Sequence, residues 1–527
     1  MAALAFARPQ LPAAAAYLSA TEKFNQLRAQ LQALQTQQMS HSELENLIQR
    51  DGREVLRLLY QAHLDERAPG TADTAVVNAD GDALTDRRTQ TRPLESVFGP
   101  VTVTRTGYGG PGLSSLHPLD AALNLPDELY SHTVRRCAAE AAAQQSYDEV
   151  GRRLAEQTGA HVPKRQIEQL AERAAQDFEP FYEQRCATAA TAAAVGATGA
   201  VLVISTDGKG VPLSRTDLRP VTRQAAEARQ PRLEHRRSKG EKPHTKRIST
   251  VAAVYTTAPF VRTPEQVAGE LRPHQQALPV NRPRPEDKRV WASLEQAPAE
   301  IIRQAFEEAE QRDPQHTKHW CALVDGHRAQ LAAVKSVAAD YGVELTIVLD
   351  LIHVTEYLWD AAWALHTEGD AQAEAWVSER LLEILRGRSS QVAAGMRRSA
   401  TLRGLSAKTR RPLDKCADYL LKYRAYLRYD QYLEAGLPIA TGVIEGACRY
   451  LVKDRMELTG ARWRLRGAEA VLRLRSLRAS GDFDEYWDYH LQQEYARTHA
   501  ARYAEGVVPL PPPPTPQPQK SHLRLVK

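Results

Sequence analysis

The sequence predicts an α/β protein whose central sheet is flanked by helices. Short apolar runs alternate with segments whose apolar residues recur three and four positions apart, the pattern of buried strands between amphipathic helices. Their order is three strands, a helix, a strand, a helix and a strand, so the sheet begins as a meander. The expected strands span 201–206, 211–215, 247–259, 319–325 and 343–353, and the expected helices span 298–313 and 328–342.

The composition is that of a globular chain with several domains. The 527 residues are 43% hydrophobic and 25% charged, with a formal net charge of +5. No run approaches the roughly 18 apolar residues of a membrane span, and the chain does not begin like a signal peptide. Five scattered cysteines form no C-x-x-C pair, which favours the reducing cytoplasm over a disulfide framework or a zinc knuckle. No dinucleotide or P-loop pattern indicates a small-molecule substrate.

The amino-terminal part is expected to hold two regions. Residues 1–90 are predicted to be mainly helical, because apolar residues keep helical spacing over 20–66, in a pattern typical of a packing or interaction hairpin. Residues 91–186 are predicted to contain a β-hairpin over 97–112 that turns at Phe-Gly-Pro.

Two further helices are expected over 146–175, separated by a Thr-Gly-Ala turn. This spacing is typical of a helix-turn-helix, in which Lys164 and Arg165 would begin the helix that enters a DNA groove. An ordinary helical hairpin has the same pattern, so both interpretations stay open.

The rest of the chain divides by composition. An Ala/Thr/Gly-rich stretch is typical of a linker, a long run of helical patterns follows the strands, and the end of the chain is rich in proline. The predicted boundaries are a linker at 187–200, a first core part at 201–353, an all-helical insertion at 354–440, a second core part at 441–495 and a Pro-rich, disordered tail at 496–527.

Two apolar strands run into an aspartate followed by glycine, at Asp207 and at Asp325. Carboxylates at the ends of adjacent strands can converge on one edge of a sheet, where they suit Mg²⁺ and phosphoryl transfer. Each aspartate could instead only start a turn. If Asp207 is a metal ligand, we expect Gly208 and Gly210 to leave room for metal and phosphate, and Lys209 to contact the DNA.

Glu445 is the candidate for a third acid. It lies between two glycines, and Arg449 and Lys453 follow at intervals of four, so the three share a helical face. An acid beside two cations suits a metal next to a phosphate backbone, although an exposed ladder of ion pairs has the same spacing.

Basic clusters favour a nucleic-acid partner. From Arg215 to Arg247 there are 11 Lys or Arg and four Asp or Glu, and a second basic run with interleaved aromatic residues spans 449–478. Aromatic rings can stack on unpaired bases, although a tryptophan at position 463 suits a core equally well. The candidate DNA-binding residues are Lys164, Arg165, Lys209, Arg236, Arg237, Lys242, Lys246, Arg247, Arg449, Lys453, Arg462, Trp463 and Arg464.

Together these segments resemble the ISKra-type insertion-sequence transposases of the DDE transposase superfamily. The resemblance covers roughly 40–495 and depends on the ordered set rather than on any single motif. The segments that carry it are FGPVTVTRTGYG (98–109), LHPLDAALNLPDELYS (116–131), STDGKGVP (205–212), EKPHTKRISTVAAVYTTAPFVRTPE (241–265), NRPRPEDKRVWASLE (281–295), CALVDGHRAQL (321–331), DLIHVTEYLWDAAWA (350–364) and TGVIEGACRYLVKDRMELTGARWRLRGAEAVLRLRSL (441–477).

The resemblance implies an RNase H-like core with a helical insertion, in a bacterial enzyme that cleaves and joins DNA strands. It implies that Asp207, Asp325 and Glu445 are the catalytic acids and bind two Mg²⁺ or Mn²⁺ ions. Asp350 and His353, in DLIH, match a motif after the second acid and would support the site. Asp350 also ends an apolar strand, so it remains an alternative to Asp325 as the second acid.

The partners implied are the terminal inverted repeats of the element and a target DNA, bound by a homo-oligomer in the cytoplasm. Two other functions stay open. One is a structure-selective nuclease on the same fold, and the other is a DNA-binding protein derived from a transposase that has lost catalysis.

Overall fold

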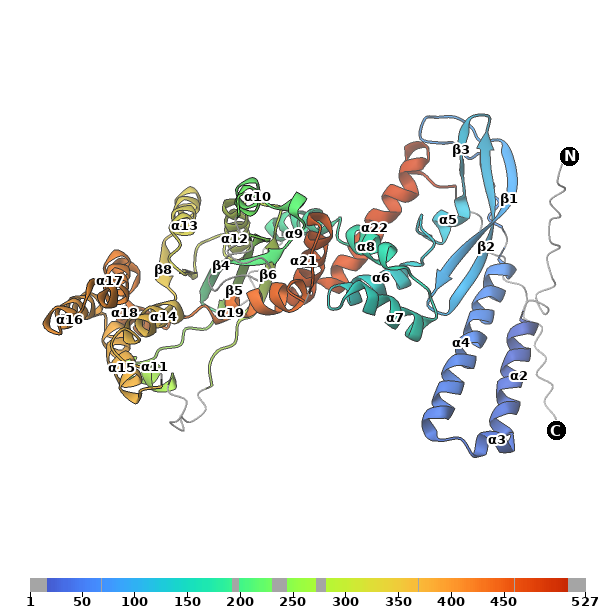
Figure 1. Ribbon diagram of the computed structural model, residues 1–527. Coiled ribbons are helices and arrows are strands. Elements are labelled where there is room, and N and C mark those ends of the chain that lie inside the picture. The colour runs from blue at the N-terminus through green and yellow to red at the C-terminus, as the bar shows by residue number, and fades with distance from the viewer. Residues whose placement is uncertain are drawn as a thin grey trace, which may run out of the picture. The chain divides into compact units, whose positions relative to one another are not determined.

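The computed structural model describes residues 17–67, 69–191, 199–229, 244–271, 281–367, 369–458 and 460–509 (Figure 1). The chain forms two compact units, one made of Met1–Asp177 with Asp484–Lys527 and the other of Phe178–Phe483. The second unit is therefore inserted in the sequence of the first. No helix of the described ranges has the length and apolarity to cross a membrane.

The first unit begins with an antiparallel helical hairpin, followed by a three-stranded antiparallel sheet and a group of helices. The hairpin is α2 (Leu18–Gln32), α3 (Leu34–Gln37) and α4 (His41–Glu66), and a capping box between Ser40 and Glu43 starts α4. The sheet is β1 (Asp86–Ser96), β2 (Gly99–Gly110) and β3 (Leu113–Leu116). The helices are α5 (Pro118–Ala122), α6 (His132–Ala142), α7 (Tyr147–Thr158), α8 (Lys164–Ala174) and α22 (Phe483–Thr498).

Most helices of this unit and the turn of its β-hairpin were predicted from the sequence. The hairpin turn lies at Phe98, and Gly99 follows it with a positive φ of 114°, which suits glycine. The first strand, β1, was not predicted, because most of its residues are polar and it lacks the alternation of a half-buried strand. In α22, residues 484–495 belong to this unit, although the sequence analysis continued the core to 495.

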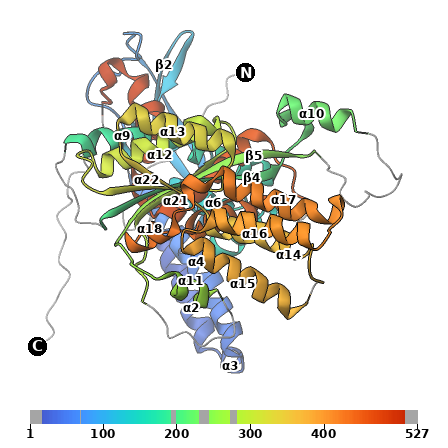
Figure 2. The ribbon, with the colours of Figure 1, turned by 90° about the vertical axis from the view of Figure 1, so that its left-hand side faces the viewer.

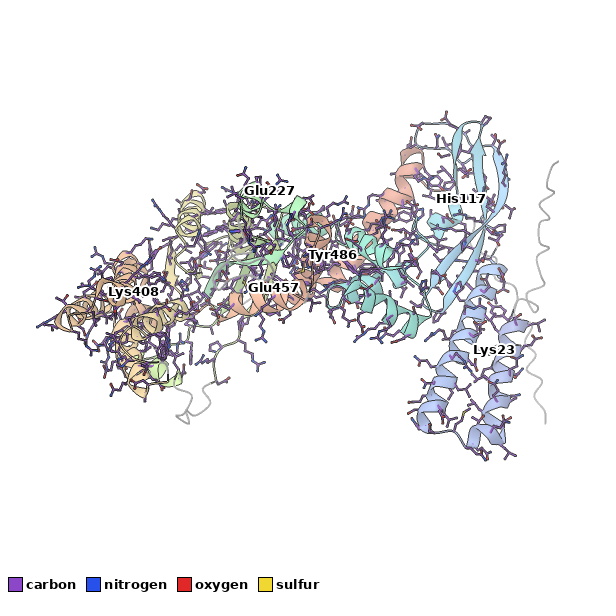
Figure 3. All side chains as sticks on the ribbon, in the orientation of Figure 1. Lys23, His117, Glu227, Lys408, Glu457 and Tyr486 are labelled. Atoms are coloured by element: carbon purple, nitrogen blue, oxygen red, sulfur yellow. The ribbon has the colours of Figure 1, made fainter. Side chains whose placement is uncertain are left out.

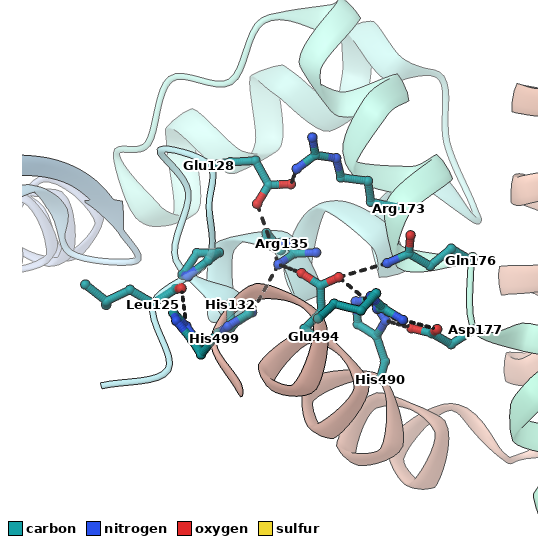
Figure 4. Close-up of polar contacts among 12 residues, drawn as sticks. Leu125, Glu128, His132, Arg135, Arg173, Gln176, Asp177, His490, Glu494 and His499 are labelled. Atoms are coloured by element: carbon teal, nitrogen blue, oxygen red, sulfur yellow. Dashed lines mark hydrogen bonds and ion pairs between the residues drawn. The ribbon is translucent and has the colours of Figure 1, made fainter. Parts of the chain in front are cut away.

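A buried polar network ties α22 to α6 and to the end of α8 (Figure 4). The fully buried Arg135 donates to Glu494 Oε2 at 2.9 Å, and Gln176 donates to the other oxygen of Glu494 at 2.8 Å. His490 Nδ1 lies 2.7 Å from Asp177 Oδ2. Burial alone would raise the pKa of Glu494, but the charges of Arg135 and a neighbouring arginine offset this and lower it to about 2.

The second unit is built on a mixed five-stranded sheet in the order β6-β5-β4-β7-β8. The first three strands along the chain pair antiparallel, with β4 and β5 labelled next to each other in Figure 2, and β7 and β8 add in parallel beside β4. The strands are β4 (Val201–Pro212), β5 (Lys246–Thr257), β6 (Glu286–Ser293), β7 (His319–Val324) and β8 (Leu345–Leu349).

Helices cover both faces of this sheet. Trp320 of β7 packs against Phe306 of α12, and α13 follows on the same face. Asp207 of β4 lies on the opposite face, where it meets the residues that follow α19. The helices beside the sheet are α9 (Phe178–Thr191), α12 (Pro298–Arg312), α13 (Arg328–Tyr341), α19 (Gly442–Ala447) and α21 (Leu465–Ser480), with the short α10 (Pro220–Glu227) and α11 (Pro264–Glu270) between strands.

The predicted order of α12, β7, α13 and β8 is confirmed, whereas before α12 one expected strand does not exist and one observed strand was not expected. The segment 211–215 is not a separate strand, because β4 continues through Asp207 to Pro212. The third strand is β6, which the sequence analysis did not assign because four of its eight residues are charged.

The segment between the last strand and α19 is helical wherever it is described, as expected. It consists of α14 (Leu351–Ala362), α15 (Ala371–Leu385), α16 (Ser389–Leu402), α17 (Ala407–Lys422) and α18 (Tyr429–Glu434). Part of the expected linker, 192–198, and most of the Pro-rich tail, 510–527, lie outside the described residues.

Candidate active site at the carboxyl edge of the sheet

Asp207 lies inside a strand, not at a turn. β4 pairs with β5 along its whole length, whereas its parallel ladder with β7 ends at Ser205. The turn expected after Asp207 was wrong, because antiparallel hydrogen bonding to β5 carries the Gly-Lys-Gly sequence onward in extended form. Asp207 thus lies in the part of β4 that extends beyond its ladder with β7, where β4 has a paired strand on one side only.

The glycines beside Asp207 serve strand packing. A Cβ at Gly208 would lie 3.0 Å from Ile248 Cγ2, and a Cβ at Gly210 would lie 3.0 Å from Lys246 Cδ. Side chains alternate along a strand, so both positions face away from the side that carries Asp207. The expectation that these glycines make room for a metal and a phosphate was therefore wrong.

Asp207, Asp325 and Asp350 fall at the carboxyl edge of three neighbouring strands. Asp207 and Asp325 each lie two positions beyond the last residue pair of the β4–β7 ladder. Asp325 and Asp350 each lie one position beyond the last pair of the β7–β8 ladder. Because adjacent strands are about 4.8 Å apart, this register gathers the three acidic positions at one edge.

The two candidates for the second acid differ in their hydrogen bonds. Asp350 is only 3% exposed, and its carboxylate caps α14 by accepting from two backbone N–H groups of the first turn and from the Thr441 N–H at 2.9 Å. Asp325 is half-buried, and its Oδ1 accepts from the His327 N–H at 2.8 Å. A carboxylate with three backbone donors has little capacity left for a ligand. This difference favours Asp325 as the acid that faces a substrate.

Glu445 completes the acidic group from α19. The Thr441 hydroxyl donates to Glu445 Oε1 at 3.2 Å, while the Thr441 N–H holds Asp350. Partial burial raises the pKa of Glu445, and the negative charges of Asp350, Glu356 and Asp207 raise it further against the hydrogen bond from Thr441. Asp350, Glu356 and Asp207 therefore lie close enough to Glu445 for their negative charges to disfavour its ionised form.

Cys448 was not anticipated from the sequence. Its thiol donates to Asp207 Oδ2 at 3.2 Å, and burial together with the charge of Asp207 raises the pKa of the thiol. The charge of Lys209 acts in the opposite direction, so this lysine also lies within electrostatic reach of the site. The only sequence feature that could have indicated a role for Cys448 is its position three residues after Glu445, on the next helical turn.

Tyrosines of the helical insertion hold the strand ends in place. The Tyr419 hydroxyl donates to the carbonyl of Asp325 at 3.2 Å, and the Tyr423 hydroxyl donates to that of Gly326 at 2.5 Å. At the end of β8, the Tyr429 hydroxyl donates to the carbonyl of Leu349. These residues were also missed, because a tyrosine at helical spacing is indistinguishable in sequence from an ordinary core residue.

His353 lies at the rim of this edge, on α14. Its ring packs edge-on against Tyr357 and Tyr419, with ring centroids 5.4 and 5.9 Å away, and its Nδ1 is 3.2 Å from Glu356. It is joined to Asp350 through its backbone N–H. The structure thus places it among the groups that position the acids.

Some predicted DNA-binding cations are exposed near the site. Arg449 and Lys453 lie on the exposed side of the turns that follow Glu445, and residues 448–453 form a π-helical turn, a feature often found at functional sites. Arg462 and Arg464 are exposed as well.

Other predicted cations have structural partners. Arg247 donates to the Leu294 carbonyl at 2.9 Å and to the Asp217 carbonyl at 3.2 Å, which ties its guanidinium to the protein. Lys246 pairs with Glu457. Three members of the predicted set, Arg236, Arg237 and Lys242, lie outside the described residues.

Trp463 belongs to the core. It is 8% exposed, its indole N–H donates to the Met456 carbonyl at 3.1 Å, and the Arg455 guanidinium lies 4.6 Å from the ring centroid. The prediction that this ring stacks on a base is corrected, because neither face of a ring so enclosed is open to one.

Lys164 and Arg165 lie in the first unit, at the start of α8. The predicted pair of helices is confirmed, and Gly159 ends α7 with a φ of 74°. Both cations are exposed, and Lys164 Nζ lies 2.5 Å from Asp148 Oδ2. Whether the pair is a helix-turn-helix or an ordinary helical hairpin stays open, and DNA binding by it stays a prediction.

The donor set fits a divalent cation. Within the described ranges, no group of three or more His, Cys, Asp or Glu side chains has the arrangement of a formed metal site. However, the negative charges of Asp350 and Asp207 help burial to raise the pKa of Glu445, so these two acids lie within electrostatic reach of Glu445. Carboxylate oxygens are the ligands that Mg²⁺ prefers.

Compared with protein-family models and with curated proteins, the chain matches none.

Proposed function

We propose that this chain is a DDE-type insertion-sequence transposase with an RNase H-like core. The sheet order β6-β5-β4-β7-β8, with three antiparallel strands followed by two parallel ones, supports that fold. The observation that carries the proposal is the register, which brings Asp207 and Asp325 to the same edge of adjacent parallel strands. Glu445 reaches this edge from a helix much later in the chain, as the resemblance implies.

Asp207, Asp325 and Glu445 would hold two Mg²⁺ or Mn²⁺ ions, which lower the pKa of an attacking water and stabilise the leaving oxygen. Thr441 orients Glu445 through its hydroxyl, and Tyr419 fixes the backbone of Asp325. Lys209, on the same strand face as Asp207, would contact a phosphate oxygen. Asp350 is assigned a supporting role, because its oxygens cap α14 and bind Thr441.

The reaction would consist of one hydrolysis followed by one transesterification. Water first attacks the phosphorus at the element end, and the P–O bond breaks to leave a 3′-hydroxyl. This hydroxyl then attacks a phosphorus of the target strand and displaces the target's own 3′-oxygen. The hydrolysis consumes one water and one phosphodiester bond, and the strand transfer forms one phosphodiester bond for each one that it breaks. No nucleotide cofactor and no covalent protein–DNA intermediate is therefore required.

The test uses the purified full chain, Mg²⁺, labelled DNA that flanks the gene, and a supercoiled target plasmid. We expect labelled DNA joined to the plasmid, and we expect Asp207→Asn to abolish the joined product. Asp340→Asn is the matched control, since Asp340 is an exposed acid on α13. Cleavage without joining would identify a nuclease, and a bound complex without cleavage would contradict any catalytic role.

A further inference from the structure

The helical hairpin α2–α4 has an unusual concentration of exposed apolar side chains. Among the described residues, eight of the 18 exposed large hydrophobic residues lie on this hairpin. The most exposed is Leu34, at 78%. A soluble protein rarely leaves such a patch uncovered. The eight are Leu18, Phe24, Leu31, Leu34, Met39, Ile48, Leu56 and Leu59.

The spacing of these residues is that of helices which pack against other helices. On α2, Phe24 and Leu31 are seven positions apart, as in a heptad repeat. On α4, Ile48, Leu56 and Leu59 are separated by eight and three positions, so they lie on one side of the helix. An apolar stripe thus runs along each helix.

The contact between the two helices of the hairpin does not bury these apolar stripes. The buried residues of α2 are Ala20 and Leu27, and a partly buried ion pair of 3.1 Å joins Lys23 to Asp51 of α4. Lys23 is labelled on the hairpin in Figure 3. The carboxyl-terminal half of α4 packs on the three-stranded sheet, where Leu64 and Tyr60 belong to the same apolar cluster as Val101. The part of the hairpin without a second layer among the described residues is therefore α2 and the first half of α4.

Charge decides what occupies the patch. Residues 18–66 contain five Lys or Arg and seven Asp or Glu, so the hairpin has a net charge of −2 and lacks the excess of basic residues that attracts a phosphate backbone or an anionic membrane. Within it, α2 has a net charge of +1 and α4 a net charge of −3. Two hairpins related by a two-fold axis, with α2 of one against α4 of the other, are therefore complementary in charge as well as apolar.

We propose that this hairpin is a self-association surface, on which the α2–α4 hairpins of two copies of the chain pack into a four-helix bundle. In a closed two-fold contact both copies use the same patch. This arrangement suits the hairpin, because α2 and α4 have net charges of opposite sign and α2 of one copy can lie against α4 of the other. This goes beyond the proposed function, because it requires neither DNA nor metal.

The test is the molar mass of the full chain in sedimentation velocity, without DNA or Mg²⁺. We expect twice the chain mass for the unchanged protein, and half of that value for the double variant Phe24→Glu with Ile48→Glu. The control variant, Val221→Glu with Leu402→Glu, adds the same charges at side chains that are 78% and 77% exposed outside the hairpin, and it should keep the doubled mass.

A milder pair, Phe24→Ser with Ile48→Ser, guards against misfolding, and circular dichroism spectra should match for all variants. The proposal is overturned if the unchanged chain has the mass of a single copy, if the hairpin variants keep the doubled mass, or if the control loses it equally. None of these results would bear on catalysis.

Discussion

The Cys448 thiol donates a hydrogen bond to Asp207 Oδ2 across 3.2 Å, joining a strand to a helical turn 241 positions later in the chain. This contact and the hydrogen bond between Thr441 and Asp350 attach the late helix to two separate strand ends. The acidic edge is consequently assembled by tertiary contacts that have no counterpart in local sequence.

Replacing Cys448 with alanine should lower the free energy of unfolding by about 1 kcal/mol, because it removes a partly buried hydrogen bond to a carboxylate. Cys448→Ser keeps a donor of similar size and should stay closer to the unchanged protein. Urea titration monitored by circular dichroism measures both. Equal losses for the two variants would show that packing, not the hydrogen bond, is what Cys448 contributes.

The variants Asp325→Asn and Asp350→Asn should separate catalysis from stability. We expect Asp325→Asn to abolish strand cleavage with little change in melting temperature, because Asp325 is half-buried. Asp350→Asn replaces one of two oxygens that accept from backbone N–H groups with an NH₂ group, and this lost hydrogen bond should cost about 1 kcal/mol of stability. Cleavage assays and thermal melts on the same preparations decide this, and cleavage retained by Asp325→Asn but lost by Asp350→Asn would reverse the assignment.

Glu445→Gln should stabilise the folded chain at neutral pH. The folded pKa of Glu445 is raised above its ordinary value of 4.5, so ionisation destabilises the folded state, and the penalty is complete above the folded pKa. Because the side chain is partly exposed, solvent limits the gain to no more than about 1 kcal/mol. At about pH 3.5 the carboxyl is protonated in both states, and the gain should vanish.

Urea titrations at both pH values measure this difference, and Glu344→Gln, an exposed glutamate before β8, is the control. A gain of equal size at both pH values would point to packing rather than charge repulsion. Added Mg²⁺ should reverse the order of stability, since the unchanged chain would gain the binding energy of the ion.

The network around Glu494 should make the first unit sensitive to acid. Its pKa of about 2 lies below the ordinary 4.5, so the stability it contributes is complete above pH 4.5 and is lost as the pH falls towards 2. Glu494→Gln leaves the buried Arg135 with only the more distant carboxylate of Glu128, 3.6 Å away, and should cost up to about 3 kcal/mol at neutral pH.

Hydrogen exchange of α22 reports this change. We expect faster exchange in Glu494→Gln at neutral pH and a smaller further increase on acidification than in the unchanged chain. Glu485→Gln, an exposed position on the same helix, should behave like the unchanged chain. If both variants exchange alike, the network does not hold α22.

The sequence located the acids better than the elements that carry them. The apolar run before Asp325 predicted a strand end that is confirmed, because a buried parallel strand has a strong continuous signal. The strand expected over 343–353 was too long, since β8 ends at Leu349 and α14 begins at Leu351. The glycines near Asp207 predicted a turn that does not form, since pairing with β5 overrides the local preference of glycine. The polar strand β6 had no such signal and was found only in the structure.

By itself, the sequence determined the α/β class, the order of the later core elements, the helical insertion and the acidic candidates, because these follow from periodicity and residue type along short segments. Only the tertiary structure decided which groups lie together: the register that aligns Asp207 with Asp325, the cap that occupies Asp350, the thiol beside Asp207 and the burial of Trp463. These depend on contacts between segments far apart in the chain, and hydrogen bonds and burial of that kind leave no local pattern in the sequence.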